Sequence, residues 1–281
     1  MNMVPCTPSL LDDERLDEVN EHIRLIQKKQ GLTFGTDAYL LAAFVRTSPS
    51  ARAVDLGSGT GIIPLLLCAR NKVRTVAAVE LQESFADLIE RNAQLNGMEN
   101  RISVCNADVR EINSATFGGE VDLVCSNPPY LKSNAGKSNR AAEKEIARHE
   151  VHGGIRDFCA AASRLLKTKG RFACVFRTER LSELFAAMKE NRLEPKRMVM
   201  VHADPHSPPC MVLVEAMKDA APSLIVEPPL FLYEEPVAGI SSREMTAMAK
   251  EIYRTCTFPE RGRAEIRSKK GEHHELELQE T

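Results

Sequence analysis

Short apolar runs alternate with amphipathic segments through most of the chain. The runs are rich in β-branched residues and have the length of strands; they lie at 52–56, 75–79, 102–105, 121–125, 170–176, 197–202 and 211–215. Segments with helical spacing fill the gaps, at 62–70, 84–96, 157–166 and 182–191. This alternation predicts an α/β fold with a mostly parallel twisted sheet and helices on both faces. A proline-rich loop, and no helix, separates the last two runs, which predicts an antiparallel hairpin at one edge.

The segments outside this pattern are predicted to be extensions. Between residues 10 and 30, the apolar residues are spaced for one face of a short helix or for a strand, and the spacing fits both. Residues 36–45 are typical of a helix whose N-cap is Thr36 or Asp37. Beyond about Pro222 the chain becomes increasingly charged, and His273 and His274 beside acidic residues indicate a solvated tail. We therefore expect an N-terminal extension at 1–30, a main domain at 31–220 and a C-terminal extension with a charged tail at 221–281.

Composition limits the classes of function. The 281 residues, 43% of them hydrophobic, can bury the core of one large domain. The net charge of -2 argues against nucleic-acid binding driven by overall charge, so any RNA contact must come from local patches. The eight cysteines stand singly, which predicts buried thiols and no metal site. Because the chain shows neither a long apolar span nor a secretory signal, we expect no membrane association and a cytoplasmic location.

A glycine-rich turn follows the first predicted strand. Glycines at Gly57, Gly59 and Gly61 let the backbone approach a nucleotide-like ligand. Glu80 ends the next predicted strand about 20 residues later, where a carboxylate accepts hydrogen bonds from ribose hydroxyls. Asp108, after the third strand, has an oxygen that accepts from an adenine amino group or caps the next helix. An ordinary turn and surface carboxylates are the alternative, but together these signals favour an adenosine-containing ligand, either S-adenosylmethionine or NAD.

The turn after the fourth predicted strand carries the strongest chemical signal. It reads Asn127-Pro128-Pro129-Tyr130, and its two prolines fix the backbone and remove two N–H donors. A planar NH2 group can donate one hydrogen to the Asn127 side-chain oxygen and the other to the Pro128 carbonyl, while Tyr130 stacks on its face. Holding the nitrogen in this way directs its lone pair toward a methyl donor and requires no nucleophilic side chain. The alternative is a loop without chemistry.

The segment Asp55-Leu56-Gly57-Ser58-Gly59-Thr60-Gly61 resembles the cofactor loop of class I S-adenosylmethionine-dependent methyltransferases. The resemblance implies a Rossmann-like fold with S-adenosylmethionine as cofactor. By that resemblance the glycines flank the methionine and ribose, Glu80 holds the ribose, Asp108 faces the adenine, and Asp55 orders the loop or meets the methionine ammonium. The cofactor-binding residues that it implies are Thr36, Asp55, Gly57, Gly59, Gly61, Glu80, Leu81, Asp108, Val109 and Asn127.

Two further segments resemble one particular family. Phe34 to Ala42 and the stretch Ala147-Arg148-His149-Glu150 are similar to the bacterial tRNA(Val) adenine-N6-methyltransferases, which modify the base next to the anticodon. The resemblance implies methylation of adenine N6 in tRNA, with Asn127, Pro128, Pro129 and Tyr130 as the catalytic residues. Phe34, Tyr130 and Arg148 would contact the flipped base and its RNA.

Other acceptors share the same turn. Methyltransferases acting on protein glutamine N5 or on guanine N2 of rRNA carry an Asn-Pro-Pro-Tyr motif as well. The glutamine enzymes usually have a helical N-terminal domain, and only about fifty residues precede Asp55 here. A non-catalytic module that binds S-adenosylmethionine or RNA is a third possibility, against which the intact turn argues. The oligomeric state is left open by the sequence.

Overall fold

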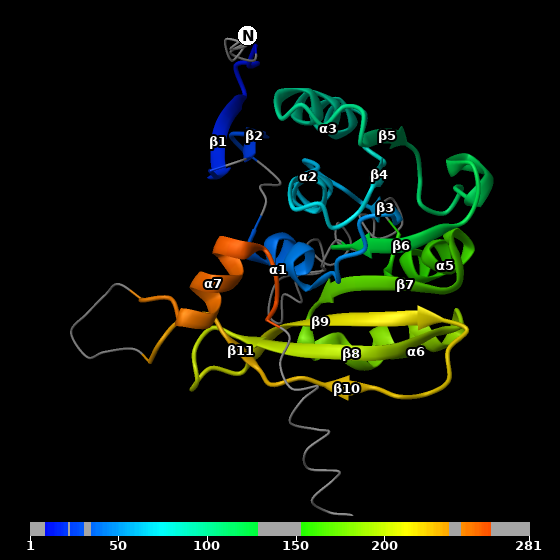
Figure 1. Cartoon of the computed structure of the whole chain (residues 1–281), viewed down its shortest axis with the longest axis vertical. Helices are drawn as coiled ribbons and strands as arrows, with labels where there is room; N and C mark the ends of the chain where they lie inside the picture. Colours follow the sequence, from blue (N-terminus) through cyan, green and yellow to red (C-terminus); the bar gives the residue numbers. More distant parts are fainter. Residues whose placement is uncertain (1–8, 22, 31–34, 129–152, 236–242, 260–281) are drawn as a thin grey trace, which may run out of the picture.

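The computed structural model describes residues 9–21, 23–30, 35–128, 153–235 and 243–259. Most of these residues form one α/β unit around a large twisted sheet (Figure 1). The strands follow the order β10-β8-β9-β7-β6-β3-β4-β5, and β11 also pairs with β8. These strands are β3 (Arg52–Leu56), β4 (Thr75–Glu80), β5 (Ile102–Asn106), β6 (Val121–Ser126), β7 (Leu166–Phe176), β8 (Leu193–His202), β9 (Pro209–Lys218), β10 (Ile225–Val226) and β11 (Leu230–Phe231).

Helices cover both faces of the sheet, as the alternating pattern predicts. They are α1 (Thr36–Phe44), α2 (Ile62–Ala69), α3 (Glu83–Leu95), α5 (Ile155–Leu165), α6 (Leu181–Glu190) and α7 (Ala247–Thr255), with short 3-10 turns η1 (Ser114–Phe117) and η2 (Thr178–Arg180). Neighbouring strand residues point to opposite faces. Ala53 and Leu123 pack with α1 and α2 on one face, whereas Val54 and Val124 pack with α5 and α6 on the other. Two buried layers therefore hold the parallel strands between them.

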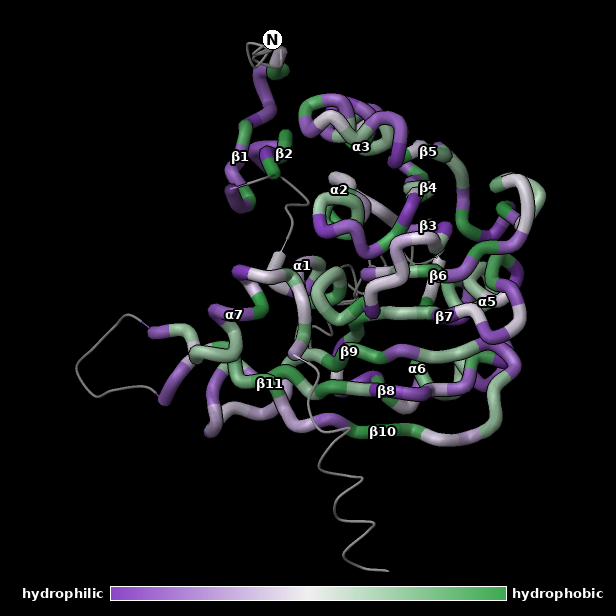
Figure 2. Tube along the Cα trace, in the orientation of Figure 1, coloured by the Kyte–Doolittle hydropathy of each residue, from purple (hydrophilic) through white to green (hydrophobic). Residues whose placement is uncertain are grey.

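The predicted antiparallel hairpin is confirmed by β8 and β9. Strand β9 pairs antiparallel with both β7 and β8, while β3, β4, β5, β6 and β7 are joined by parallel pairing. The short strands β10 and β11 pair with the outer side of β8, so residues beyond 220 extend the sheet. Figure 2 shows β10 as a hydrophobic stretch at this edge, where Ile225 is 54% exposed and Val226 is 63% exposed.

The N-terminal segment is a β-hairpin, which resolves the choice between helix and strand. Strand β1 (Glu14–Asn20) pairs antiparallel with β2 (Ile23–Lys28), apart from the large sheet (Figure 1). Ile23 and Leu25 of β2 are buried in the same core as α1 and α2, and Ile26 is buried on the other side against α3. The hairpin packs beside α3, where a bidentate ion pair links Glu14 to Arg91.

Helix α1 begins one residue earlier than its predicted cap implies. Its N-cap is Gly35, and no side chain caps it, so the prediction of Thr36 or Asp37 as N-cap is wrong. The Asp37 carboxylate accepts instead from Ala38 N and from the side-chain amide of Asn127, which follows β6. Among the described residues, no helix is long and apolar enough to cross a bilayer.

Candidate active site

The candidate site lies where the carboxyl ends of four parallel strands meet. Leu56 at the end of β3 is paired with Val79 of β4 and with Ser126 of β6, and Glu80 is paired with Asn106 of β5. Loops that follow these strands therefore emerge along one edge of the sheet. In α/β folds this edge is where ligands bind.

The glycine turn after β3 has a backbone that other residues would strain. Gly57, Gly59 and Gly61 all have positive φ, at 71°, 56° and 81°. A Cβ at Gly61 would come within 3.0 Å of Ile89, so this glycine also permits close packing of the loop against α3. A Cβ at Gly59 would have no heavy atom within 4 Å, so the backbone there borders open space. The turn thus combines a tightly packed end with an open middle that a ligand can approach.

Glu80 connects the strand β4 to the glycine turn. Its Oε2 accepts from Gly59 N at 2.9 Å and its Oε1 accepts from Gln82 N at 3.0 Å. The carboxylate is thereby fixed beside the open middle of the turn. Asn106 supports the same corner by donating to the carbonyls of Glu80 and Leu81. Leu81 itself is 36% exposed and offers an apolar surface next to that carboxylate.

Asp55 is a carboxylate enclosed in the core at the end of β3. Its side chain is fully buried in β3, and neither oxygen has a hydrogen-bond partner among the described residues. Burial raises the pKa of Asp55 to about 7; the Ser58 hydroxyl close by opposes this rise in part, and the nearby Glu80 carboxylate adds to it. A buried carboxylate of this kind favours a cationic ligand group or a bound water close by.

Asp108 lies beside the same edge but is engaged by a neighbour. Both of its oxygens accept from the Arg110 side chain, and Oδ1 also accepts from Arg110 N at 2.8 Å. The adjoining Val109 is buried in the core. An adenine amino group at Asp108 would therefore have to share or replace the guanidinium.

The acceptor turn begins at the end of β6, next to the glycine turn. Ser126 Oγ donates to Leu56 O at 2.9 Å, which ties the two strand ends together. Asn127 follows, and its Nδ2 donates to Asp37 Oδ2 at 3.1 Å. Thr36 precedes Asp37 at the start of α1, and Pro128 is buried. The predicted residues Pro129, Tyr130, Phe34 and Arg148 lie outside the described residues.

A comparison with known proteins identifies the family of this fold and site. The family model of the methyltransferase small domain matches residues 29–191, more than half of the chain. The chain belongs to the methyltransferase small domain family. It is thus a methyltransferase with a Rossmann-like fold.

Curated relatives of this methyltransferase carry one specific name. A tRNA1(Val) (adenine(37)-N6)-methyltransferase of Porphyromonas gingivalis is 29% identical over 229 residues, which cover 79% of this chain and 88% of the relative. A protein of the same name from Aeromonas hydrophila is 35% identical over 151 residues, covering 53% of this chain and 61% of the relative.

Solved structures agree on the fold. A predicted O-methyltransferase from Agrobacterium tumefaciens superimposes with a TM-score of 0.63 at 23% identity, over 80% of this chain and 98% of that one. Pyrococcus horikoshii TYW2, solved in complex with MeSAdo, superimposes with a TM-score of 0.52 at 17% identity, over 75% of this chain and 73% of that one. Both support a Rossmann-like methyltransferase fold.

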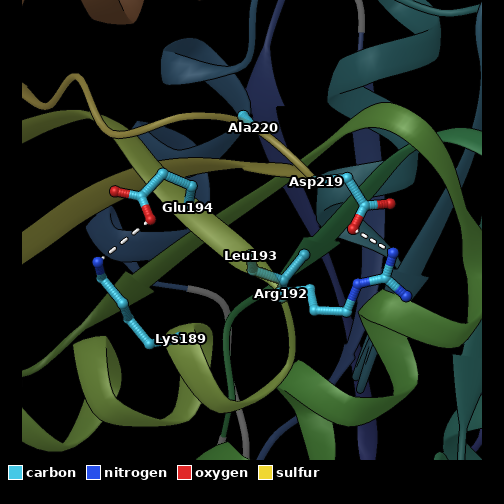
Figure 3. A pocket seen from close by; sticks show the side chains of 6 residues that line it. All are labelled: Lys189, Arg192, Leu193, Glu194, Asp219 and Ala220. Atoms are coloured by element: carbon cyan, nitrogen blue, oxygen red, sulfur yellow. Dashed lines mark ion pairs between the residues drawn. The ribbon is translucent and has the colours of Figure 1, made fainter.

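A cavity elsewhere on this methyltransferase shares no residue with the predicted site. A surface depression of about 240 Å³ lies between the start of β8 and the end of β9 (Figure 3). This is the amino end of the parallel strands, whereas the glycine turn lies at their carboxyl end. Its charged walls are paired with each other, Lys189 with Glu194 at 3.3 Å and Arg192 with Asp219 at 2.6 Å. It therefore presents balanced charge.

Sequence reasoning missed three polar residues that organise the site. Asp37 is paired with Asn127, Asn106 holds the corner after β4, and Asn92 of α3 donates to Thr60 O in the glycine turn. Asp37 lies in the segment from Phe34 to Ala42 that resembles the tRNA(Val) adenine-N6-methyltransferases, but that resemblance assigns it no role. For Asn92 and Asn106, the only signal in the sequence is a polar residue within or at the end of a predicted helix or strand.

Proposed function

We propose that the chain transfers the methyl group of S-adenosylmethionine to the exocyclic N6 of an adenine in tRNA. The observation that carries the proposal is the position of Asn127. Asn127 follows the last residue of β6, beside the glycine turn that follows β3. The same end of the sheet therefore carries both a glycine turn that a nucleotide could approach and a side-chain amide. The name shared by the curated relatives supports this acceptor, and the family match supports the methyl transfer.

The residues around the glycine turn fit S-adenosylmethionine. The open backbone at Gly59 leaves room for the ligand, and Glu80, whose Oε2 accepts from Gly59 N, would also accept from the ribose hydroxyls. Asp55 would face the methionine ammonium, directly or through a water, because its buried carboxylate has no partner among the described residues. Leu81 and Val109 would pack on the adenine, with Asp108 beside the adenine amino group and Thr36 at the methionine end. The ligand supplies a methyl carbon made electrophilic by its sulfonium.

The protein contributes orientation at the acceptor nitrogen. The Asn127 side-chain oxygen and the Pro128 carbonyl would each accept one hydrogen of the NH2 group, which turns the nitrogen lone pair toward the methyl carbon. Bound S-adenosylmethionine would supply the methyl group, and the electron pair of the broken C–S bond would stay on its sulfur. The methylated nitrogen would then lose one proton to solvent. Pro129, Tyr130, Phe34 and Arg148 complete the proposed contacts with the base and its RNA.

The proposal places the catalytic unit at 31–220, between the N-terminal hairpin and the C-terminal extension. Because its proposed substrate is tRNA, we place the protein in the cytoplasm. RNA contacts would come from local basic patches, since the net charge of the chain is -2.

Methyl transfer to RNA tests the proposal. The purified protein is incubated with S-adenosylmethionine labelled in the methyl group and with tRNA from cells lacking the protein, and the labelled nucleosides are separated. Label in N6-methyladenosine is expected. Label confined to protein would favour a glutamine acceptor, and label in N2-methylguanosine of rRNA would favour a guanine acceptor; each would reject the adenine assignment. Binding of the cofactor without transfer to any of these acceptors would favour a non-catalytic module.

A further inference from the structure

Asp37 and Asn127 meet although they are 90 residues apart in the sequence. Asn127 Nδ2 donates to Asp37 Oδ2 at 3.1 Å, and Ala38 N donates to Asp37 Oδ1 at 2.9 Å. Each carboxylate oxygen therefore faces a donor. Both side chains are half-buried, so water competes only partly for these bonds.

The pairing selects one orientation of the Asn127 amide. The two ends of a side-chain amide have nearly the same shape, but the nitrogen only donates and the oxygen only accepts. An ionised carboxylate also only accepts. A flipped amide would place Asn127 Oδ1 against Asp37 Oδ2, which loses a charge-assisted hydrogen bond and brings two electronegative atoms together. The carboxylate thus holds the amide nitrogen toward α1 and the amide oxygen on the opposite side.

Asp37 is held in place because α1 is fixed along its length. Every residue of the helix from Ala38 to Phe44 is buried. At the C-terminal end, the Lys72 ammonium donates to the carbonyls of Ala42, Ala43 and Val45 at 2.9, 2.8 and 2.8 Å. At the other end, the Asp37 carboxylate lies in the first turn, where the helix dipole favours negative charge. The helix cannot shift to follow a rotated side chain without disturbing the core.

We propose that Asp37 is a positioning residue, which fixes the Asn127 amide with its oxygen toward the acceptor nitrogen. This inference rests on the proposed function and sharpens it, because it names the chemistry that the turn accepts. A site that presents only oxygen atoms selects a group that brings two hydrogens, such as the 6-amino group of adenine. It disfavours the 6-oxo group of hypoxanthine, which would place oxygen against oxygen.

The test compares Asp37→Asn with the wild-type protein. The variant keeps the shape of the side chain but lets residue 37 either donate or accept, so the Asn127 amide is free to flip. We expect the single-turnover rate at saturating RNA and S-adenosylmethionine to fall 10- to 100-fold, while the Kd of S-adenosylmethionine changes less than twofold. The matched control is Glu83→Gln, which removes an exposed carboxylate from the first turn of α3 and is expected to leave the rate unchanged.

Two further readouts separate positioning from a structural role. An RNA that carries inosine in place of the methylated adenosine serves as a competitive inhibitor. It should inhibit Asp37→Asn more strongly, relative to unmodified RNA, than it inhibits the wild type. In an Asn127→Ala background, Asp37→Asn should lower the rate less than twofold further, because the amide that it orients is gone.

The outcomes are distinguishable from failure of the proposed function. If the wild-type protein methylates no adenine in RNA, the proposed function is wrong and the role of Asp37 falls with it. If the wild type is active but Asp37→Asn keeps its full rate, the positioning role alone is refuted. A third outcome is that the wild type is active, the losses from Asp37→Asn and Asn127→Ala are additive, and discrimination against inosine is unchanged. Asp37 would then be a structural residue, which also refutes the positioning role.

Discussion

Asp55 is a residue that destabilises the fold in which it sits. A buried polar group without a partner costs roughly 1–3 kcal/mol, and neither Asp55 oxygen has a partner among the described residues. The raised pKa, about 7, expresses the same penalty on the charged form. Such a cost persists in proteins where function requires it, and here a ligand cation would offset it.

Asp55→Asn should therefore stabilise the ligand-free protein and weaken binding of S-adenosylmethionine. Because the pKa of Asp55 in the folded state lies above the ordinary value of 3.8 for an aspartate, the folded state binds more protons between about pH 4 and 7. The stability of the wild type then falls as pH rises through this window, and the variant lacks that fall. Thermal unfolding from pH 4.5 to 8 measures the difference. A variant with lower Tm than the wild type at pH 8 would contradict the argument.

The affinity for S-adenosylmethionine should rise with pH over the window in which stability falls. A protonated Asp55 cannot pair with an ammonium, so the Kd of the wild type should increase about tenfold for each pH unit below 7. Calorimetric titrations with S-adenosylmethionine from pH 5.5 to 7.5 check this. The dependence should be nearly flat in Asp55→Asn, and an equal slope in both proteins would assign the titration to another group.

Asn127→Ala separates acceptor chemistry from cofactor binding. Removing the side-chain oxygen leaves one acceptor hydrogen unpaired, which costs about 1–3 kcal/mol or roughly a 5- to 150-fold loss in rate. Single-turnover kinetics on tRNA should show this loss, while the Kd of S-adenosylmethionine stays within a few-fold of the wild type. Unchanged kinetics would remove Asn127 from the mechanism.

Among the elements, the N-terminal hairpin is joined to α3 by two asparagines whose side-chain amides hydrogen-bond the main chain of β2. Asn92 Oδ1 accepts from Ile26 N at 2.7 Å, and its Nδ2 donates to Ile26 O at 3.0 Å. Asn96 makes the same two bonds with Arg24, at 3.0 and 2.8 Å. Asn92 Nδ2 also donates to Thr60 O at 3.0 Å, which links the hairpin to the glycine turn.

Asn92→Leu and Asn96→Leu should therefore differ in their effect on the cofactor. Each variant leaves the outward main-chain N–H and C=O of one β2 residue without the asparagine, Ile26 in the first case and Arg24 in the second, and should lower the free energy of unfolding by about 1–3 kcal/mol. Only Asn92→Leu releases Thr60 in the glycine turn, so only this variant should weaken the Kd of S-adenosylmethionine severalfold. Denaturant unfolding and calorimetry measure the two quantities. Equal Kd values for the two variants would show that the glycine turn is independent of the hairpin.

The elements also show what a sequence can predict. The parallel strands are predictable because both faces are buried, which makes runs such as 76–79 continuously apolar. The hairpin β1–β2 was ambiguous because its edge is completed by Asn92 and Asn96, about 70 residues away. Strands β10 and β11 have two residues each, too few for a pattern, and exist through pairing with β8.

In the site, too, sequence spacing locates the residues of the turn but not the side-chain contacts between distant residues. Gly57, Gly59 and Glu80 could be placed from spacing, because a strand followed by a tight turn puts them at one edge. The cap of α1 is Gly35, and the Asp37 carboxylate, predicted as a possible cap, pairs with Asn127 across the molecule, which spacing in the sequence does not indicate. The pairing of Asp108 with Arg110 likewise depends on side-chain conformation and not on spacing.

At the scale of the whole molecule, residues beyond 220 pack against the helix that carries Asp37. Figure 1 shows α7 lying beside α1, far from it in the sequence. Tyr39 and Tyr253 are stacked with their ring centroids 4.8 Å apart, and Tyr39 Oη donates to Tyr253 O at 2.6 Å. Phe258 meets Phe44 edge to face at 5.7 Å. The predicted C-terminal extension thus supports one wall of the candidate site.

A chain ending at Ala220 should consequently lose stability and methyl transfer together. It lacks Ile252 and Cys256, which are fully buried, and it exposes the Tyr39 and Phe44 rings. Each large apolar side chain returned to water costs about 1.5–3 kcal/mol, so the loss should exceed roughly 3 kcal/mol and lower the Tm by about 10 °C. A chain ending at Pro259 keeps all of these contacts and is the matched control, measured by the same thermal unfolding and by methyl transfer to tRNA. If the shorter chain unfolds at the same temperature as the control and retains its rate, α1 needs no support from α7, and the fixed position inferred for Asp37 must come from Lys72 and the core alone.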